Sequence, residues 1–418
     1  MATDSLKSAI DPPVEQLVDE FTRAWMAAAE TVDLGPAFND EGHAIRESHM
    51  DQFLGQALEE LRNPPSTPDG YAALETRMLI ELAHLGQSSM DLTPAQLEIL
   101  LGRGIPRSLV QFSQTARGHR SLSDDEIFQA SRNVAVMNVL QLLLGSPCQL
   151  TPSVVAYSLL YPYSDNYLDN PAVLLATRSE FNGRFGRRLA GENVAPSNRK
   201  EKAIFDLVET IESEKDRGRL PQVYDSLLAI QRAQSKSMDL EAMKHPRLDD
   251  VLAVTIEKGG TSVLADAFLV AENGLTPRQV RFIFSLGVFL QLVDDLQDLK
   301  QDRKRGNVTL FGLAAKNAAS LESLTNRAIA FGTRVMDYLD GFTAPGIDPL
   351  KEVIHMSVTD LMIGAAAPNQ ELFSSEYVRR IEAHFPFRFN YIKKVRATLK
   401  KREVSFTSLL NLLTAQKA

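Results

Sequence analysis

The sequence predicts an all-α protein, and three observations lead to that prediction. Apolar residues recur at three- and four-residue spacings through most of the chain, which is the pattern of helices with one buried face. Helix starts are also marked: Ser123 with Glu126 has the capping-box arrangement, and Pro152 after Thr151 suits a first helical position. No run of alternating β-branched residues is bounded by turn pairs, so strand signals are scarce. We therefore expect a single-domain helical bundle.

The expected helices follow one another along the chain with short connections. They cover residues 14–32, 43–61, 71–85, 94–101, 105–115, 127–144, 201–214, 221–236, 246–258, 261–272, 280–299, 321–339, 350–363 and 375–384, with a proline-rich break at 63–68. The pattern is clearest in 280–299, where the spacing is kept by Phe282, Ile283, Leu286, Phe289, Leu290, Val293 and Leu296. We expect an N-terminal helical layer, residues 1–120, and a bundle that carries the chemistry, residues 121–418, within one compact domain.

Composition and charge indicate what kind of all-α protein this is and where it resides. Of the 418 residues, 44% are hydrophobic and 23% are charged, which is ordinary for a globular chain. The net charge of −8 argues against nucleic-acid binding. The single cysteine, Cys148, excludes an internal disulfide and suits a reducing compartment. Since no stretch resembles a secretory signal or approaches the roughly 18 apolar residues of a membrane span, we expect a cytoplasmic protein.

The chain is organised around an acidic helix end. Asp294, Asp295 and Asp298 follow a long apolar run, and Asp302 comes one turn later. Positions four apart lie on one face of a helix, so Asp294 and Asp298 stack, whereas Asp295 is turned by about 100°. Acids at the end of a buried helix are costly unless they hold a cation or a base. Carboxylate oxygens from successive turns are what a hard Mg²⁺ ion uses, so these acids are candidate metal ligands.

Basic residues follow the acids at once: Lys300, Arg303, Lys304 and Arg305. They permit two interpretations. In one, the helix end is solvated and the acids merely pair with these bases. In the other, Mg²⁺ completes its coordination on substrate phosphates, and the neighbouring bases contact the same anion.

A second acidic patch follows the apolar residues 153–161. Asp165 and Asp169 lie four apart, with Asn166 and Asn170 as a neighbouring stripe. We expect Pro162 to kink this helix or to start a new one. Alone, this spacing is common on solvated helix faces. Two such patches, each at the end of an apolar helix, favour a shared site.

Two other stretches bear on the site. Gly259 and Gly260 interrupt a helical pattern, and we expect the pair to break the helix and present Lys258 nearby, although a plain helix–turn–helix loop is the alternative. Residues 178–188 are basic and aromatic. We favour a surface loop there, with Arg178 or Arg184 as candidate phosphate contacts.

The motif Gly287-x-x-x-Gln291-x-x-Asp294-Asp295-x-x-Asp298 resembles the second aspartate-rich motif of class I isoprenoid synthases, with Leu290 where the trans-prenyl synthases have Phe. The second acidic patch, Asp165-Asn-Tyr-Leu-Asp169, departs from the Asp-Asp-x-x-Asp of chain-elongating enzymes. It is similar to the first motif of squalene and phytoene synthases and of bacterial large-terpene synthases. The resemblance implies an all-α bundle around a central cavity, with two aspartate-rich helices facing each other across its mouth.

The resemblance also implies a set of roles. Mg²⁺, or Mn²⁺ in its place, would be held by Asp165, Asp169, Asp294, Asp295, Asp298 and Asp302, of which Asp165, Asp169, Asp294 and Asp298 are the expected catalytic residues. Lys258, Arg305 and Arg178 would contact the substrate diphosphate. Ionisation of an allylic prenyl diphosphate leaves a carbocation that needs a dry apolar cavity, for which Phe282, Phe289 and Tyr161 are candidates, with plain core positions as the alternative.

We therefore expect a Mg²⁺-dependent terpene synthase that forms a terpene from an allylic prenyl diphosphate. It should not need isopentenyl diphosphate, because Pro171 interrupts the position where elongating enzymes carry an arginine pair. Squalene- or phytoene-type head-to-head condensation is the alternative, as are a catalytically inactive relative and a helical interaction protein. A homodimer is left open. Residues 385–402 mix bases with aromatics, which suits peripheral contact with an anionic membrane, although a solvated helix with its aromatics packed inward is the alternative we favour.

Overall fold

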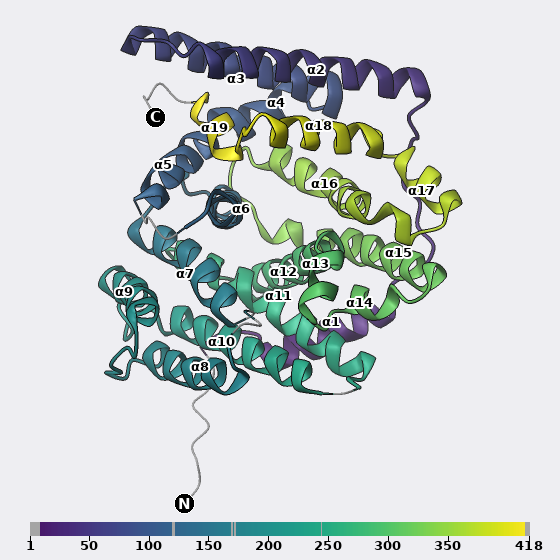
Figure 1. The fold of residues 1–418 in the computed structure, drawn as a ribbon. Helices are drawn as coiled ribbons and strands as arrows, with labels where there is room; N and C mark the ends of the chain where they lie inside the picture. The colour runs from purple at the N-terminus through teal and green to yellow at the C-terminus, as the bar shows by residue number, and fades with distance from the viewer. Residues whose placement is uncertain (1–8, 119–121, 169, 171–172, 244, 414–418) are drawn as a thin grey trace, which may run out of the picture. The chain divides into compact units, whose positions relative to one another are not determined.

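The all-α prediction is confirmed. The structure is a computed structural model that describes residues 9–118, 122–168, 170, 173–243 and 245–413, without the side chains of residues 161, 165 and 406. Within these ranges the regular structure consists of helices, and no strand occurs (Figure 1). None of the described helices is long and apolar enough to cross a bilayer.

The chain divides into two compact units, each built from two separate stretches of sequence. The first unit comprises Met1–Val32 and Thr151–Phe342, and the second comprises Asp33–Leu150 and Thr343–Ala418. This division differs from the expected boundary after residue 120. The physical reason is that helices from both ends of the chain pack with one another in the second unit, which no single cut in the sequence can describe.

The first unit is centred on a helical hairpin. Its long helices α11 (Leu248–Val270) and α12 (Pro277–Gln297) pack along their length, and most side chains of α11 are buried. Around the hairpin lie α1 (Val14–Met26), α7 (Pro152–Leu168), α8 (Leu175–Leu189), α9 (Arg199–Glu214), α10 (Pro221–Ala242), α13 (Leu299–Arg305), α14 (Leu310–Ala314), α15 (Ala318–Val335) and the 3₁₀ helix η2 (Met336–Gly341).

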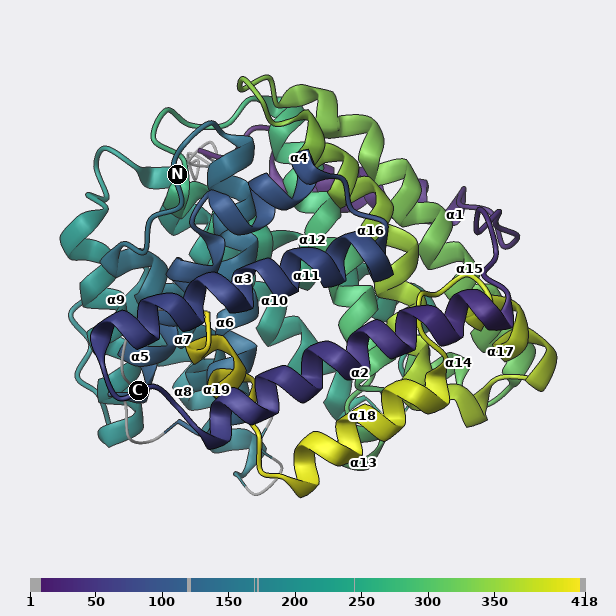
Figure 2. The same ribbon diagram turned by 90° about the horizontal axis from the view of Figure 1, so that it is seen from above.

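The second unit is framed by two long helices, α2 (Asp40–Arg62) and α3 (Pro68–Met90), which lie side by side (Figure 2). It continues with α4 (Pro94–Leu97), the π-helix η1 (Glu98–Gly102), α5 (Ile105–Arg117), α6 (Asp124–Leu143), α16 (Asp348–Ala366), the 3₁₀ helix η3 (Ala367–Leu372), α17 (Ser375–Glu382), α18 (Phe389–Lys401) and α19 (Phe406–Asn411). The capping box at the start of α6 is confirmed, since Ser123 accepts from the Glu126 backbone and donates its own N–H to that carboxylate.

The predicted helix break at Gly259-Gly260 is wrong. Helix α11 runs through both glycines without interruption. Instead, the glycines let α12 approach: a Cβ at Gly260 would lie 2.4 Å from the Phe284 ring, and one at Gly287 would lie 2.3 Å from the Gly259 carbonyl oxygen. The sequence signal reflects close helix packing, which outweighs the roughly 1 kcal/mol cost of a helical glycine.

Two neighbouring expectations are also corrected. Helix α7 continues through Pro162 to Leu168, so no new helix starts at that proline, because burial of most of the helix offsets the proline penalty of about 3 kcal/mol. Residues 178–188 lie inside α8 and do not form a surface loop. Phe181, Phe185 and Leu189 are buried there, which gives this basic stretch an apolar face to fold against.

Candidate functional site

The acidic residues lie where α12 passes into α13. Helix α12 ends at Gln297, Asp298 forms the junction, and α13 begins at Leu299. The one-turn spacing survives the junction: the Asp298 N–H donates to the Asp294 carbonyl at 2.8 Å, and the Asp302 N–H donates to the Asp298 carbonyl at 2.9 Å. Successive turns therefore present carboxylates at this end of the first unit, as the sequence predicts.

Burial separates acids that look alike in the sequence. Asp298 is exposed, Asp294 is half-buried, and Asp295 is only 6% exposed. The Gln291 amide donates to Asp295 Oδ1 at 2.7 Å and orients that carboxyl. Burial raises the pKa of Asp295 to about 7, against the lowering effect of Gln291, and the charge of Asp302 raises it further. Asp295 is thus the acid most closely held by the fold.

Lys258 connects the acids with α11. Its charge lowers the pKa of both Asp295 and Asp302, so it lies within electrostatic reach of both carboxyls. Burial nevertheless raises the pKa of Asp302 to about 6, against its hydrogen bond from Asn307, and the neighbouring Asp298 adds to the rise. One lysine of α11 therefore interacts electrostatically with two acids, one on α12 and one on α13.

A small pocket lined partly by Lys258 lies in the same unit. It lies between α7, α8, α10 and α11, and its lining is Tyr157, Leu160, Ser164, Leu168, Asn182, Phe185, Leu189, Leu227, Ile230, Gln231, Gln234 and Lys258. The α7 contributors recur at three- and four-residue spacings, so they share one face of that helix. Lys258 is thus both a pocket residue and a neighbour of the acids.

Contacts between the helices show which residues lie near each end of the pocket. At one end, Arg178 in α8 donates to the carbonyl of Leu168, the last residue of α7, at 2.5 Å and lies 3.3 Å from Glu241 near the end of α10. Further along, the Tyr157 hydroxyl donates to the Ser262 carbonyl at 3.1 Å. Tyr157 therefore lies level with a point on α11 one turn beyond Lys258.

The polar lining residues gather toward the Arg178 end. Asn182 and Gln231 are hydrogen-bonded to each other and to Ser235, with the Asn182 amide donating to the serine hydroxyl at 2.6 Å. Lys236 of α10 pairs with Glu257 at 2.5 Å. This part of α10 therefore lies beside Lys258, the next residue of α11. The other end is lined by Tyr157, Leu189 and Leu227. The pocket thus has a cationic, amide-bearing end and an apolar end.

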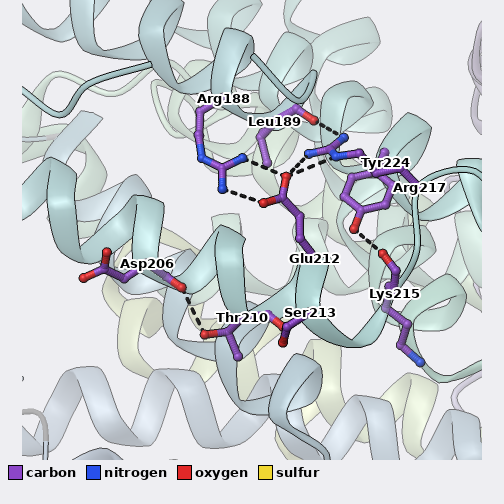
Figure 3. Close-up of polar contacts among 9 residues, drawn as sticks. All are labelled: Arg188, Leu189, Asp206, Thr210, Glu212, Ser213, Lys215, Arg217 and Tyr224. Carbon is purple, nitrogen blue, oxygen red and sulfur yellow. Dashed lines mark hydrogen bonds and ion pairs between the residues drawn. The ribbon is translucent and has the colours of Figure 1, made fainter. Parts of the chain in front are cut away.

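An ion-pair network secures the apolar end (Figure 3). Glu212 accepts two bonds from Arg188, at 2.7 and 2.5 Å, and also accepts from Arg217. Arg217 donates to the carbonyl of Leu189, a pocket residue, at 2.7 Å and stacks 3.7 Å from the Tyr224 ring centre. The end of α8 is therefore tied to α9 and α10 where the pocket is apolar.

The other residues singled out from the sequence fall as follows. Arg178 is engaged by Leu168 and Glu241. Arg305 is exposed on α13, within electrostatic reach of Asp302. Phe282 and Phe289 are buried core residues outside the pocket, which agrees with the alternative stated for them. Asp169 and the side chains of Asp165 and Tyr161 lie outside the described residues.

The sequence reasoning missed most of the pocket lining. Asn182, Gln231 and Gln234 carry no motif, and they become recognisable only as buried or half-buried amides on helices that share a pocket. The spacing of Tyr157, Leu160 and Ser164 on α7 was the one available signal, because it marks a helix face.

Among the described residues, no group of three or more Asp, Glu, His and Cys side chains is arranged to hold a metal ion by itself. The donors at the acidic end are carboxylate oxygens, which suit a hard divalent cation. Comparison of the chain with models of protein families, with curated proteins and with solved structures finds no match.

Proposed function

We propose that this protein is a Mg²⁺-dependent terpene synthase of the class I type, which ionises an allylic prenyl diphosphate and forms a terpene. One observation carries the proposal: Lys258 lines an apolar pocket and also acts electrostatically on two carboxyls, Asp295 and Asp302. A ligand with an anionic head and a long apolar body matches such a site, because its head would meet the lysine and its body would fill the pocket.

The acids at the α12–α13 junction would hold the cation. Asp294, Asp298 and Asp302 offer oxygen donors on successive turns, and phosphate oxygens of the substrate would complete the coordination. Asp165 and Asp169 are proposed as the ligands from the second patch. When bound, Mg²⁺ or Mn²⁺ would neutralise the charge that develops on the departing diphosphate.

The chain's own side chains would do the rest. Lys258 and Arg305 would donate to the diphosphate. Arg178 would instead hold the end of α7 against α10, through its contacts with Leu168 and Glu241. Gln291 would keep Asp295 in place. The apolar end, with Tyr157, would exclude water from the cation left after ionisation. We place the enzyme in the cytoplasm with peripheral membrane contact.

The test offers the protein allylic diphosphates of several lengths with Mg²⁺, each alone and then with isopentenyl diphosphate, and identifies the products. We expect a terpene and released pyrophosphate from an allylic substrate alone. Formation of a longer prenyl diphosphate only in the second mixture would contradict the proposal. A head-to-head product would select the alternative condensation.

Variants separate the roles of the residues. Lys258→Met should weaken pyrophosphate binding in the presence of Mg²⁺, and Asp294→Ala or Asp169→Ala should lose most activity, each with the fold retained. Lys200→Met, on an exposed position of α9, is the matched control and should bind and turn over normally. If Lys258→Met binds pyrophosphate as the native protein does, the pocket does not receive a diphosphate head.

A further inference from the structure

Helix α18 carries an isolated strip of positive charge in the second unit. Six of the chain's bases fall within residues 393–402, at the end of the helix and its C-cap: Lys393, Lys394, Arg396, Lys400, Lys401 and Arg402. Residues 385–402 contain no Asp or Glu, although the whole chain has a net charge of −8. This concentration of positive charge is therefore local, and it is opposite in sign to the net charge of the whole chain.

All six bases are exposed. Among the residues that the structure describes, none of them takes part in an ion pair. Lys393, Arg396 and Lys400 follow one another at helical spacing, and Lys394 and Lys401 form the adjacent row. The strip is about 14 Å long, at a rise of about 1.5 Å per residue.

The aromatic side chains of the same stretch face the protein, as in the alternative favoured from the sequence, so they do not take part in contact with a membrane. Phe387 and Phe389 are buried, and the Tyr391 hydroxyl bonds to the Glu47 carbonyl and to Asp51, at 3.0 and 2.9 Å. Arg388 pairs with the Glu47 carboxylate at 2.5 Å. The start of α18 is therefore fastened to α2, beside which it lies (Figure 2), while its bases remain outside.

We propose that the α18 strip binds the surface of a bilayer that contains anionic phospholipids. A straight helix with its bases on adjoining rows can bring them together onto a flat charged surface, and each base near such a surface adds attraction. No large apolar side chain of residues 385–402 is exposed, so the contact is electrostatic and without insertion. The same burial removes the aromatic platform on which single-stranded nucleic acid would stack. This inference does not depend on the proposed catalytic activity.

The experiment measures sedimentation of the full chain with vesicles of phosphatidylcholine alone or mixed with phosphatidylserine. We expect binding to the mixed vesicles only. Raising the ionic strength from about 0.1 M to about 1 M shortens the Debye length from about 10 Å to about 3 Å and should release the protein. Binding that is equal on both lipids, or that persists in high salt, would overturn the proposal.

Charge reversal locates the contact. Lys393→Glu with Lys394→Glu and Lys401→Glu should weaken binding by at least about a hundredfold. The matched control reverses Arg199, Lys200 and Arg219, which are exposed in the first unit, and changes the net charge equally. Circular dichroism and the urea midpoint verify that both variants are folded. Equal loss in both variants would assign the binding to overall charge. Tighter binding of an RNA oligomer than of mixed vesicles would assign the strip to nucleic acid. Either result refutes the proposal.

Discussion

Replacing Gly287 by alanine tests whether α11 and α12 depend on direct backbone contact. An added Cβ would lie 2.3 Å from the Gly259 carbonyl oxygen, 3.0 Å from its carbonyl carbon and 3.1 Å from the Val263 Cβ. Since the two nearest atoms belong to the backbone, no side-chain rotation relieves the overlap. The helices must separate locally by roughly 1 Å.

The magnitude follows from two opposing effects. Overpacking a buried site costs about 1–3 kcal/mol, and alanine regains about 1 kcal/mol of helix propensity over glycine. Because the contact involves backbone, the overpacking cost should lie at or above its upper value. We therefore expect Gly287→Ala to lower the free energy of unfolding by about 2 kcal/mol or more.

Urea unfolding followed by circular dichroism measures this change as a lower midpoint at unchanged slope. Gly183→Ala in α8 is the matched control, because nothing lies within 4 Å of its added Cβ. That variant should gain about 0.5–1 kcal/mol. A Gly287→Ala protein as stable as the native chain, or more stable, would refute the packing argument and the explanation of the glycines that rests on it.

Two further stability predictions follow from the charged groups. Burial raises the pKa of Asp360 from 3.8 to about 6, so the folded state keeps a proton that the unfolded chain loses between these values. The free energy of unfolding should therefore fall by up to about 3 kcal/mol as the pH rises through that window, and Asp360→Asn should remove the fall when urea midpoints are compared across pH. Glu212→Gln leaves Arg188 and Arg217 without their carboxylate and should cost about 1–3 kcal/mol, less than a fully buried pair because these side chains are partly exposed. Asp206→Asn, in an exposed pair, should change the urea midpoint little, and equal losses in the two variants would contradict the network's importance.

Several features of the fold could be predicted from the sequence because they depend on signals within one or two helical turns. The all-α class follows from apolar spacing, and the start of α6 follows from the Ser123–Glu126 capping box. The placement of Asp294 and Asp298 one turn apart at the end of α12 is likewise a consequence of helix geometry. These properties need no knowledge of what the helix packs against.

Tertiary structure decided what these local signals cannot reach. Gly259 and Gly260 look like a helix break, yet their role is set by α12, whose backbone faces Gly259 and whose Phe284 ring faces Gly260 too closely for a side chain. Pro162 suits the start of a new helix, yet burial of α7 carries one helix past it. In both cases packing energy between distant segments exceeds a local conformational cost.

The candidate site shows the same division. The sequence alone marked the acids and Lys258, but it ranked Asp294 and Asp298 above Asp295, which the fold buries and which Gln291 holds. It gave no sign that Lys258 also lines a pocket between α7, α8 and α10. Burial and electrostatic reach are properties of several helices together, because they depend on which surfaces exclude water from a charge. Residue type and spacing therefore determined the available chemistry of this protein, and only packing decided which of those groups share an environment.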